Sequence, residues 1–302
     1  MDLGRLGFRH DRFVRSTDLA IAALTGILGA VMPVDIDAVT RILEEAAVEE
    51  VLPRFQSLQS HEIREKDSGE LVTVADVKAE AHIARRLREL RPDAYLVGEE
   101  AVAADPSILA KIAEESLVWV VDPIDGTANF ARGNPVFAVM VGLVEEGRTV
   151  AGWIHDPVAG TTAAAEIGSG AWLGGSRLTA AAAAPLEDMR GTLHASTFAT
   201  AEMSRQIQAR RSRVHAIRSL RCAGHEYLRL ASGHIHFSLF TKLMPWDHVP
   251  GSLIYQEAGG LARTLDGADY GARSYQAAGL LLAPDATAWQ ALHDVLLGEE
   301  TD

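Results

Sequence analysis

The segment VDPIDGTANF at residues 121–130 constrains the fold more than any other part of the chain. The short apolar run at 117–121 is rich in β-branched residues and indicates a buried strand. Asp122 and Asp125 therefore stand where this strand ends. Pro123 has a fixed φ and no N–H to donate, which predicts that the chain leaves the sheet there.

The residues that follow favour a tight turn and the start of a helix. Gly126 permits the turn, and Thr127 is a preferred helix N-cap. Mg²⁺ takes oxygen ligands from one or two carboxylates and from the phosphate of a substrate. Backbone N–H groups at a helix start attract anions. Together these features predict a site for a metal ion and a phosphate group at this strand end.

Further acidic residues stand in three other blocks of the sequence. AYLVGEE ends a predicted strand with Glu99 and Glu100, PWDHVPGSLIYQEAGG places Asp247 after a tryptophan, and DSGELVTVAD ends at Asp76. With the segment described first, these blocks resemble the inositol monophosphatase family of magnesium-dependent, lithium-sensitive phosphatases. The resemblance covers roughly residues 36–296, and the blocks follow one another in family order.

The chain alternates helices with short strands, which predicts an α/β or α+β fold. Helices are expected at 38–55, 76–90, 201–213, 224–232 and 249–258, and strands at 94–98, 117–121, 136–144, 149–155, 161–166, 170–173, 192–196 and 234–240. The resemblance implies a layered α-β-α-β-α sandwich of the inositol monophosphatase and fructose-1,6-bisphosphatase type, with the site between two sub-domains. We expect residues 32–180 to form an N-terminal α+β sub-domain that carries most metal ligands. Residues 181–302 should form a C-terminal α/β sub-domain with Asp247 and the substrate-pocket residues.

Charge and cysteine content limit the partners and the compartment. The chain has 41 acidic and 28 basic residues, whereas a nucleic-acid surface would need a basic face. An acidic protein repels phosphorylated substrates at long range, and bound divalent cations can invert that field locally. Cys222 is the only cysteine, which excludes an internal disulfide framework and fits a reducing compartment. We therefore expect a cytoplasmic protein that does not bind nucleic acid.

The first 31 residues look different from the rest of the chain. Several arginines precede an apolar run at 19–32, an order similar to the first two regions of a signal peptide. That run is too short to span a membrane, and no small-residue cleavage site follows it. We expect residues 1–31 to be upstream sequence or a loose extension rather than an export signal, with Met32 as the start. No membrane partner is expected.

The resemblance also implies a set of metal ligands. In the family, the residues that match Glu99, Asp122 and the backbone carbonyl of Ile124 hold one metal ion. Asp122 also bridges to a second ion, which the residues that match Asp125 and Asp247 complete. Several carboxylates packed together are unfavourable unless cations neutralise them, so the cluster predicts bound Mg²⁺.

Other residues are expected to act on the water and the phosphate. Thr127 resembles the family threonine that orients the attacking water, and Asp76 resembles the aspartate paired with it, with Glu99 beside them in the catalytic group. The alternative is that Asp76 and Thr127 are only helix N-caps. The backbone N–H groups of Gly126 and Thr127 are expected to bind phosphate. Glu100 is expected to tune the metal ligands or to hold a third, weaker ion.

The substrate pocket departs from the family pattern. A family glutamate that hydrogen-bonds substrate hydroxyls is replaced here by Phe240, which cannot accept such a bond. A shifted register would place Thr241 or Lys242 there. In the segment RCAGHEY, which matches a region of small residues in the family, His225 and Glu226 are unusual. These two either contact a different alcohol or lie on the outer face of the helix.

The resemblance as a whole implies a Mg²⁺-dependent phosphomonoesterase that hydrolyses a small phosphorylated alcohol similar to inositol monophosphate, with about two or three ions activating water. It also implies inhibition by lithium and a homodimer. The alternative among enzymes is the same chemistry on histidinol phosphate, a sugar (bis)phosphate or a 3′-phosphoadenosine nucleotide. An alternative of another class is a non-catalytic regulatory module that binds metal and phosphate.

Overall fold

The computed structural model describes residues 34–66, 68–194 and 200–298, and the expectation for residues 1–31 lies outside them. Every element named below belongs to the unit Asp35–Asp302. Among the described residues, no helix combines the length and the apolar character needed to cross a membrane.

The larger sheet of the described chain has seven strands in the order β3-β4-β5-β6-β7-β8-β9, and only β3 and β4 are parallel neighbours. The strands are β3 Tyr95–Gly98, β4 Leu117–Asp125, β5 Ala138–Glu145, β6 Arg148–Asp156, β7 Thr161–Glu166, β8 Ala171–Leu173 and β9 Ser176–Arg177. Glu146 and Gly147 turn between β5 and β6 with positive φ angles of 50° and 79°. Two-residue turns of this kind match the twist of a hairpin, and the predicted hairpin is confirmed.

The smaller sheet has five strands among the described residues, in the order β11-β10-β12-β14-β13. The strands are β10 Arg190–His194, β11 His215–Ile217, β12 Phe237–Phe240, β13 Leu261–Thr264 and β14 Leu280–Ala283. β10 runs parallel to both of its neighbours, whereas β14 runs antiparallel to both of its own. The sequence predicted β10 and β12, and it did not reveal the other three.

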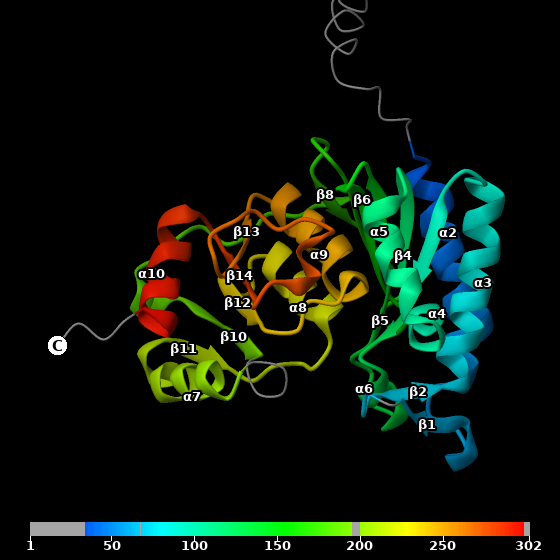
Figure 1. Cartoon of the computed structure of the whole chain (residues 1–302), viewed down its shortest axis with the longest axis horizontal. Coiled ribbons are helices and arrows are strands. Elements are labelled where there is room, and N and C mark those ends of the chain that lie inside the picture. The colour runs from blue at the N-terminus through cyan, green and yellow to red at the C-terminus, as the bar shows by residue number, and fades with distance from the viewer. Residues whose placement is uncertain (1–33, 67, 195–199, 299–302) are drawn as a thin grey trace, which may run out of the picture. The chain divides into compact units, whose positions relative to one another are not determined.

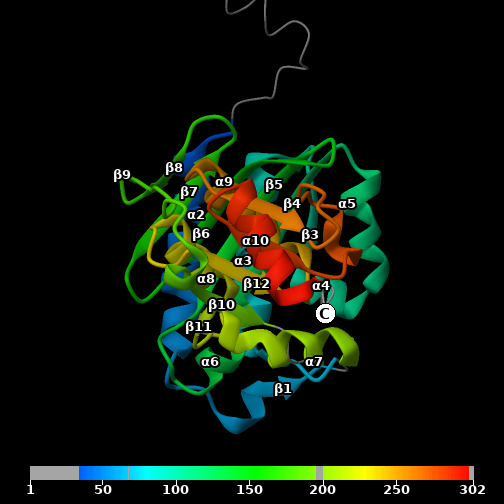
Figure 2. The same cartoon turned by 90° about the vertical axis from the view of Figure 1, so that its left-hand side faces the viewer.

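Helices and sheets alternate in layers, as Figure 1 shows. α2 and α3 pack on one face of the larger sheet, α8 and α9 lie between the sheets, and α7 and α10 lie outside the smaller sheet, in front in Figure 2. These helices are α2 Ile36–Ala46, α3 Val74–Leu90, α7 Ala201–Arg210, α8 Ala223–Ala231, α9 Pro245–Glu257 and α10 Ala286–Leu297. Shorter elements are β1 Ile63–Glu65, β2 Leu71–Thr73, α4 Glu99–Ala104, α5 Lys111–Glu114 and α6 Thr127–Ala131. The layer order is the predicted α-β-α-β-α sandwich.

Two paired glycines set α9 directly against the larger sheet. Gly142 on β5 faces Gly152 on β6. A Cβ atom on Gly142 would lie 2.7 Å from Val249 Cγ1, and one on Gly152 would lie 2.8 Å from the carbonyl oxygen of Pro250. Because real Cβ atoms do not approach so closely, this packing requires glycine on both strands. The contact brings the first turn of α9 to the sheet edge where β4 ends.

Strand β4 continues past the point where the sequence predicted its end. The prediction stopped the strand at Val121 because of Pro123, but β4 runs to Asp125. The pairing of β3 with β4 ends at Gly98 opposite Val121, so one side of β4 beyond that residue has no strand neighbour. Proline is tolerated at such an unpaired edge. On the other side the register to β5 shifts between Asp122 and Asp125, which marks an irregularity in the ladder.

The helices that carry Asp76 and Asp247 begin earlier than predicted. α9 begins at Pro245 rather than Val249, because proline has no N–H to leave unsatisfied in a first turn, and this places Asp247 within that turn. α3 begins at Val74 after the N-cap Thr73, so Asp76 is the third helical residue rather than the first. Thr73 and Asp76 form a reciprocal capping box.

A buried histidine in β6 leads to a pH prediction. His155 Nδ1 lies 2.9 Å from Thr162 Oγ1, and burial lowers the pKa of His155 from 6.5 to about 4. Since the unfolded chain binds this proton more readily, the free energy of unfolding should fall as the pH drops from 6.5 towards 4. His155→Gln keeps a polar partner for Thr162 without titrating, so we expect it to lose less stability over this window. Urea unfolding at a series of pH values measures both slopes, and equal slopes would contradict the prediction.

Candidate active site

Three carboxylates meet where β4 ends and α9 begins. Asp122 and Asp125 come from β4 and Asp247 from α9, with one oxygen of each within 4.8 Å of the others. Asp122 is 1% exposed, and its Oδ1 has no hydrogen-bond partner among the described residues. Burial, together with the charges of Glu99, Asp125 and Asp247, raises the pKa of Asp122 well above its ordinary value. Burial and the charge of Asp125 raise the pKa of Asp247 to about 8.

This cluster fits a divalent cation. Carboxylates held together without a counter-charge are unfavourable, and the orphaned Asp122 oxygen adds an unmet demand for a positive ligand. Oxygen-only donors of this kind are the ligands of hard cations such as Mg²⁺.

Asp125 also joins β4 to the start of α8. Its Oδ1 accepts a hydrogen bond from the Ala223 N–H at 3.1 Å, and its Oδ2 accepts bonds from the Gly224 N–H at 2.6 Å and the Cys222 thiol at 2.8 Å. Burial and the charge of Asp125 raise the pKa of the Cys222 thiol, which keeps it protonated as a donor. A Cβ atom on Gly224 would lie 3.0 Å from Ala138 Cβ, so the close approach needs a small residue.

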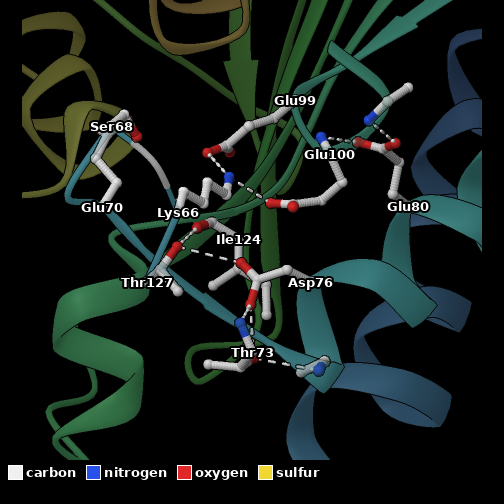
Figure 3. A network of polar contacts seen from close by, with 12 residues as sticks. Lys66, Ser68, Glu70, Thr73, Asp76, Glu80, Glu99, Glu100, Ile124 and Thr127 are labelled. Atoms are coloured by element: carbon white, nitrogen blue, oxygen red, sulfur yellow. Dashed lines mark hydrogen bonds and ion pairs between the residues drawn. The ribbon is translucent and has the colours of Figure 1, made fainter. Parts of the chain in front are cut away.

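A lysine bridges the two glutamates at the start of α4, as Figure 3 shows. Lys66 Nζ lies 2.7 Å from Glu99 Oε1 and 2.7 Å from Glu100 Oε1. Burial opposes the charge of Lys66, but the neighbouring Glu99 and Glu100 hold the pKa of this amine above its ordinary value. Burial raises the pKa of Glu99, and the lysine partly offsets this effect. Lys66 therefore places a positive charge between these two carboxylates.

Glu80 on α3 holds the first turn of α4 in place. Its carboxylate oxygens accept hydrogen bonds from the backbone N–H groups of Glu100 at 2.8 Å and Ala101 at 2.9 Å. A Cβ atom on Gly98 would lie 2.4 Å from this carboxylate, so glycine is required before Glu99. Sequence reasoning missed Glu80, whose role depends on the packing of α3 against α4.

Thr127 and Asp76 face each other, as Figure 3 shows. Thr127 Oγ1 lies 3.2 Å from Asp76 Oδ1 and 2.9 Å from the carbonyl oxygen of Ile124. The other oxygen of Asp76 accepts hydrogen bonds from the N–H and the hydroxyl of Thr73 at 2.8 and 2.5 Å. Burial raises the pKa of Asp76 to about 7 even though the Thr73 bonds oppose this shift. Asp76 thus caps α3 with one oxygen and approaches Thr127 with the other.

The turn before Thr127 depends on Gly126. Its φ of 85° is in the left-handed region, and a Cβ atom there would lie 3.0 Å from the carbonyl oxygen of Val136. α6 is only five residues long, so its macrodipole adds little to anion binding.

A cavity of about 800 Å³ is lined by most of the residues predicted for the site, namely Glu99, Asp122, Ile124, Asp125, Gly126, Thr127 and Asp247. Asp76 and Glu100 are not among the residues that line it. His225 and Glu226 do not line the cavity. His225 Nε2 lies 3.1 Å from the carbonyl oxygen of Phe137, and Glu226 is fully buried where it accepts the Leu220 N–H at 2.7 Å.

The cavity is also lined by residues that sequence reasoning named only in part. Phe240 lines it, as do Thr241 and Lys242. Arg221, the first residue of the segment RCAGHEY, lines it as well. His194, Ser219 and Arg132 line it too, and no motif pointed to them.

The chain is similar to several known proteins. The profile of the inositol monophosphatase family matches residues 33–299. Fructose-1,6-bisphosphatase/inositol-1-monophosphatase of Thermotoga maritima is 31% identical over 212 residues, which cover 70% of this chain and 78% of the relative. Nus factor SuhB of Vibrio cholerae is 26% identical over 72% of this chain and 80% of that protein. The crystal structure of the extragenic suppressor protein SuhB of Bartonella henselae superposes with a TM-score of 0.75 at 25% identity, covering 88% of this chain and 99% of that one.

Proposed function

Because the chain belongs to the inositol monophosphatase family, a family of phosphoric monoester hydrolases, we propose that it is a Mg²⁺-dependent hydrolase of a small phosphate monoester. The observation that carries this proposal is the buried cluster of Asp122, Asp125 and Asp247, with its unpartnered Asp122 oxygen. These carboxylates, Glu99 and the Ile124 carbonyl are the proposed ligands. Bound Mg²⁺ would neutralise this charge, lower the pKa of a water molecule and polarise the phosphate.

The other residues of the site position the reactants. Thr127 would orient the attacking water through its hydroxyl, and Asp76 would accept the proton through Oδ1, because that oxygen lies beside the hydroxyl. The backbone N–H groups of Gly126 and Thr127 are the proposed phosphate contacts, since both residues line the cavity. Glu100 and Glu80 hold Glu99 in place through the first turn of α4.

The reaction on inositol monophosphate remains one option among several. Histidinol phosphate, a sugar (bis)phosphate and a 3′-phosphoadenosine nucleotide are alternative substrates, because Phe240 stands in the cavity without a hydroxyl acceptor. His225 and Glu226 are less suited to contact the alcohol, since neither lines the cavity. Inhibition by lithium, a homodimer and a cytoplasmic location stay predictions from the sequence.

A second candidate function is a regulatory module that binds metal and phosphate without turnover. The similarity to Nus factor SuhB of Vibrio cholerae supports this second candidate. It differs from the first candidate in one measurable property, since it predicts tight binding of Mg²⁺ and phosphate without hydrolysis of any ester.

Phosphate release from a panel of small monoesters tests the proposal. We expect release with Mg²⁺ and none after removal of divalent cations with a chelator, because the carboxylate cluster needs a counter-charge to bind a phosphate. The panel should contain inositol 1-phosphate, histidinol phosphate, sugar phosphates and a 3′-phosphoadenosine nucleotide. Binding of Mg²⁺ and phosphate by calorimetry without release from any ester would favour the regulatory module instead.

A further inference from the structure

Arg221 is held in a backbone conformation that arginine rarely adopts. Its φ is 59°, in the left-handed region, and it is one of few non-glycine residues there in the described chain. An L-residue with a long side chain is strained in this conformation, and such strain persists only where surrounding contacts fix it. Glycine at this position would adopt the same positive φ without strain.

Three polar contacts fix this turn. The Arg221 N–H donates to Ser219 Oγ at 3.0 Å. The side-chain amide of Asn129 donates to the carbonyl oxygens of Leu220 at 2.9 Å and Arg221 at 3.3 Å. Asn129 is buried and belongs to α6, the short helix that follows the carboxylates of β4. The turn that carries Arg221 is therefore tied to the same element that carries Thr127.

The charge of Arg221 is unsatisfied within the described chain. Arg221 and Arg132 both line the cavity and are exposed, and neither guanidinium contacts a carboxylate of the described residues. Two nearby lysines differ from these arginines because both have acidic partners. Lys242, which lines the cavity, is paired with Glu70, and Lys66 bridges the glutamates of α4. Although the protein has a net charge of −13, two arginines at the cavity thus have no carboxylate partner among the residues that the structure describes.

The cavity-lining residues next to Arg221 make contacts with one another. The rings of His194 and Phe240 stack at 4.4 Å with an angle of 21° between their planes. His194 Nδ1 lies 3.2 Å from Ser219 Oγ, and the Thr241 hydroxyl donates a hydrogen bond to the His194 carbonyl oxygen at 2.8 Å. The hydroxyls of Ser219 and Thr241 and the Nδ1 atom of His194 are thus engaged, whereas the guanidinium groups of Arg221 and Arg132 have no carboxylate partner among the described residues.

On the basis of the proposed function, we infer that Arg221, assisted by Arg132, binds a second anionic group on the alcohol part of the substrate. The substrate class is then a phosphate monoester that carries another phosphate or a carboxylate. The planar guanidinium forms paired hydrogen bonds with either group, which a neutral alcohol cannot accept as strongly. The strained turn holds this side chain at the cavity, so that its charge is in place before the substrate arrives.

The test compares substrates that differ only in the second anionic group. Fructose 1-phosphate and fructose 1,6-bisphosphate differ by a phosphate, and glycerol 3-phosphate and 3-phosphoglycerate differ by a carboxylate. We expect wild type with Mg²⁺ to favour the more anionic member of at least one pair by about 10- to 100-fold in kcat/KM, the range of a charged hydrogen bond. Arg221→Gln should bring that ratio close to one. The ratio should also fall with added salt in wild type and not in the variant.

Arg218→Gln is the matched control. Arg218 is exposed, precedes the same turn and does not line the cavity, so its loss removes the same charge from the protein. This control should keep the wild-type ratio. A preference in the fructose pair alone would show that Arg221 recognises a second phosphate. A preference in both pairs would show that it recognises either anionic group.

Three results would overturn the inference. Wild type could hydrolyse both members of each pair equally, Arg221→Gln could keep the preference, or Arg218→Gln could lose it as well. Failure of the proposed function looks different, because no ester in either pair would then release phosphate with any of the three proteins.

Discussion

Replacing Asp122 with asparagine is expected to abolish Mg²⁺-dependent phosphate release and to stabilise the metal-free protein. Loss of a residue that merely orients a metal ligand costs about 10- to 100-fold, so loss of a shared ligand should cost more than about 100-fold in kcat. Stability should change in the opposite direction, because the neutral amide removes a buried charge that Asp125, Asp247 and Glu99 disfavour. Each kcal/mol gained should raise the melting temperature by about 2–4 °C in a domain of this size.

The gain in stability should depend on pH. In the metal-free wild type, burial and Asp125 raise the pKa of Asp247 to about 8, so the cluster is fully charged only above that pH. A raised carboxylate pKa means that the folded protein binds more protons than the unfolded chain, and stability therefore falls as the pH rises towards 8. Asp122→Asn should show its largest advantage above pH 8 and a smaller one at lower pH.

Thermal unfolding in a chelator and in Mg²⁺, with phosphate release measured in parallel, checks this prediction. Wild type should gain stability on addition of Mg²⁺, whereas Asp122→Asn should gain much less. Asp188→Asn, which changes an exposed carboxylate outside the cavity, should behave as wild type in both assays. A variant at Asp122 that is less stable in the chelator, yet still stabilised by Mg²⁺, would show that the cluster is not the metal site.

The sequence could predict the residues whose positions depend on their immediate neighbours. Asp122 and Asp125 follow an apolar run, and Gly126 permits the turn after them, so the sequence could predict their common location at a strand end. The extension of β4 through Pro123 was not, because it depends on where the neighbouring strand β3 stops. The direction of His225 depends on how α8 is rotated against the start of β5, which a single sequence does not specify.

Contacts between distant segments left only faint traces in the sequence. Asp125 accepts hydrogen bonds from residues 97 to 99 positions away, and Glu80 caps a helix 20 positions further along the chain. The trace in each case is a glycine, since Gly224 and Gly98 stand where a Cβ atom would crowd these carboxylates. A glycine beside an acidic block is thus informative once the partner is known, but it does not identify that partner.

Replacing Thr127 with alanine is expected to lower kcat by about 10²- to 10⁴-fold, the usual contribution of a positioned proton acceptor and its relay. The hydroxyl of Thr127 lies 3.2 Å from Asp76 Oδ1, and no other hydroxyl of the described residues contacts that oxygen. Alanine is a good helix former and the N-cap is Gly126, so the start of α6 should survive the change. The affinity for Mg²⁺, measured by calorimetry, should change little because the carboxylates stay.

Thr127→Ser is the matched control, because it restores the hydroxyl without the methyl group, and it should keep kcat within about 10-fold of wild type. The pH profile adds a second readout. Burial raises the pKa of Asp76 to about 7, and cations bound nearby would favour its charged form, so the acid limb of kcat should lie at or below pH 7. The Asp76→Asn variant should lose that limb together with most of its activity. If alanine and serine at position 127 gave equal rates, the water would have to be oriented without this hydroxyl, and Asp76 would be left with its capping role alone.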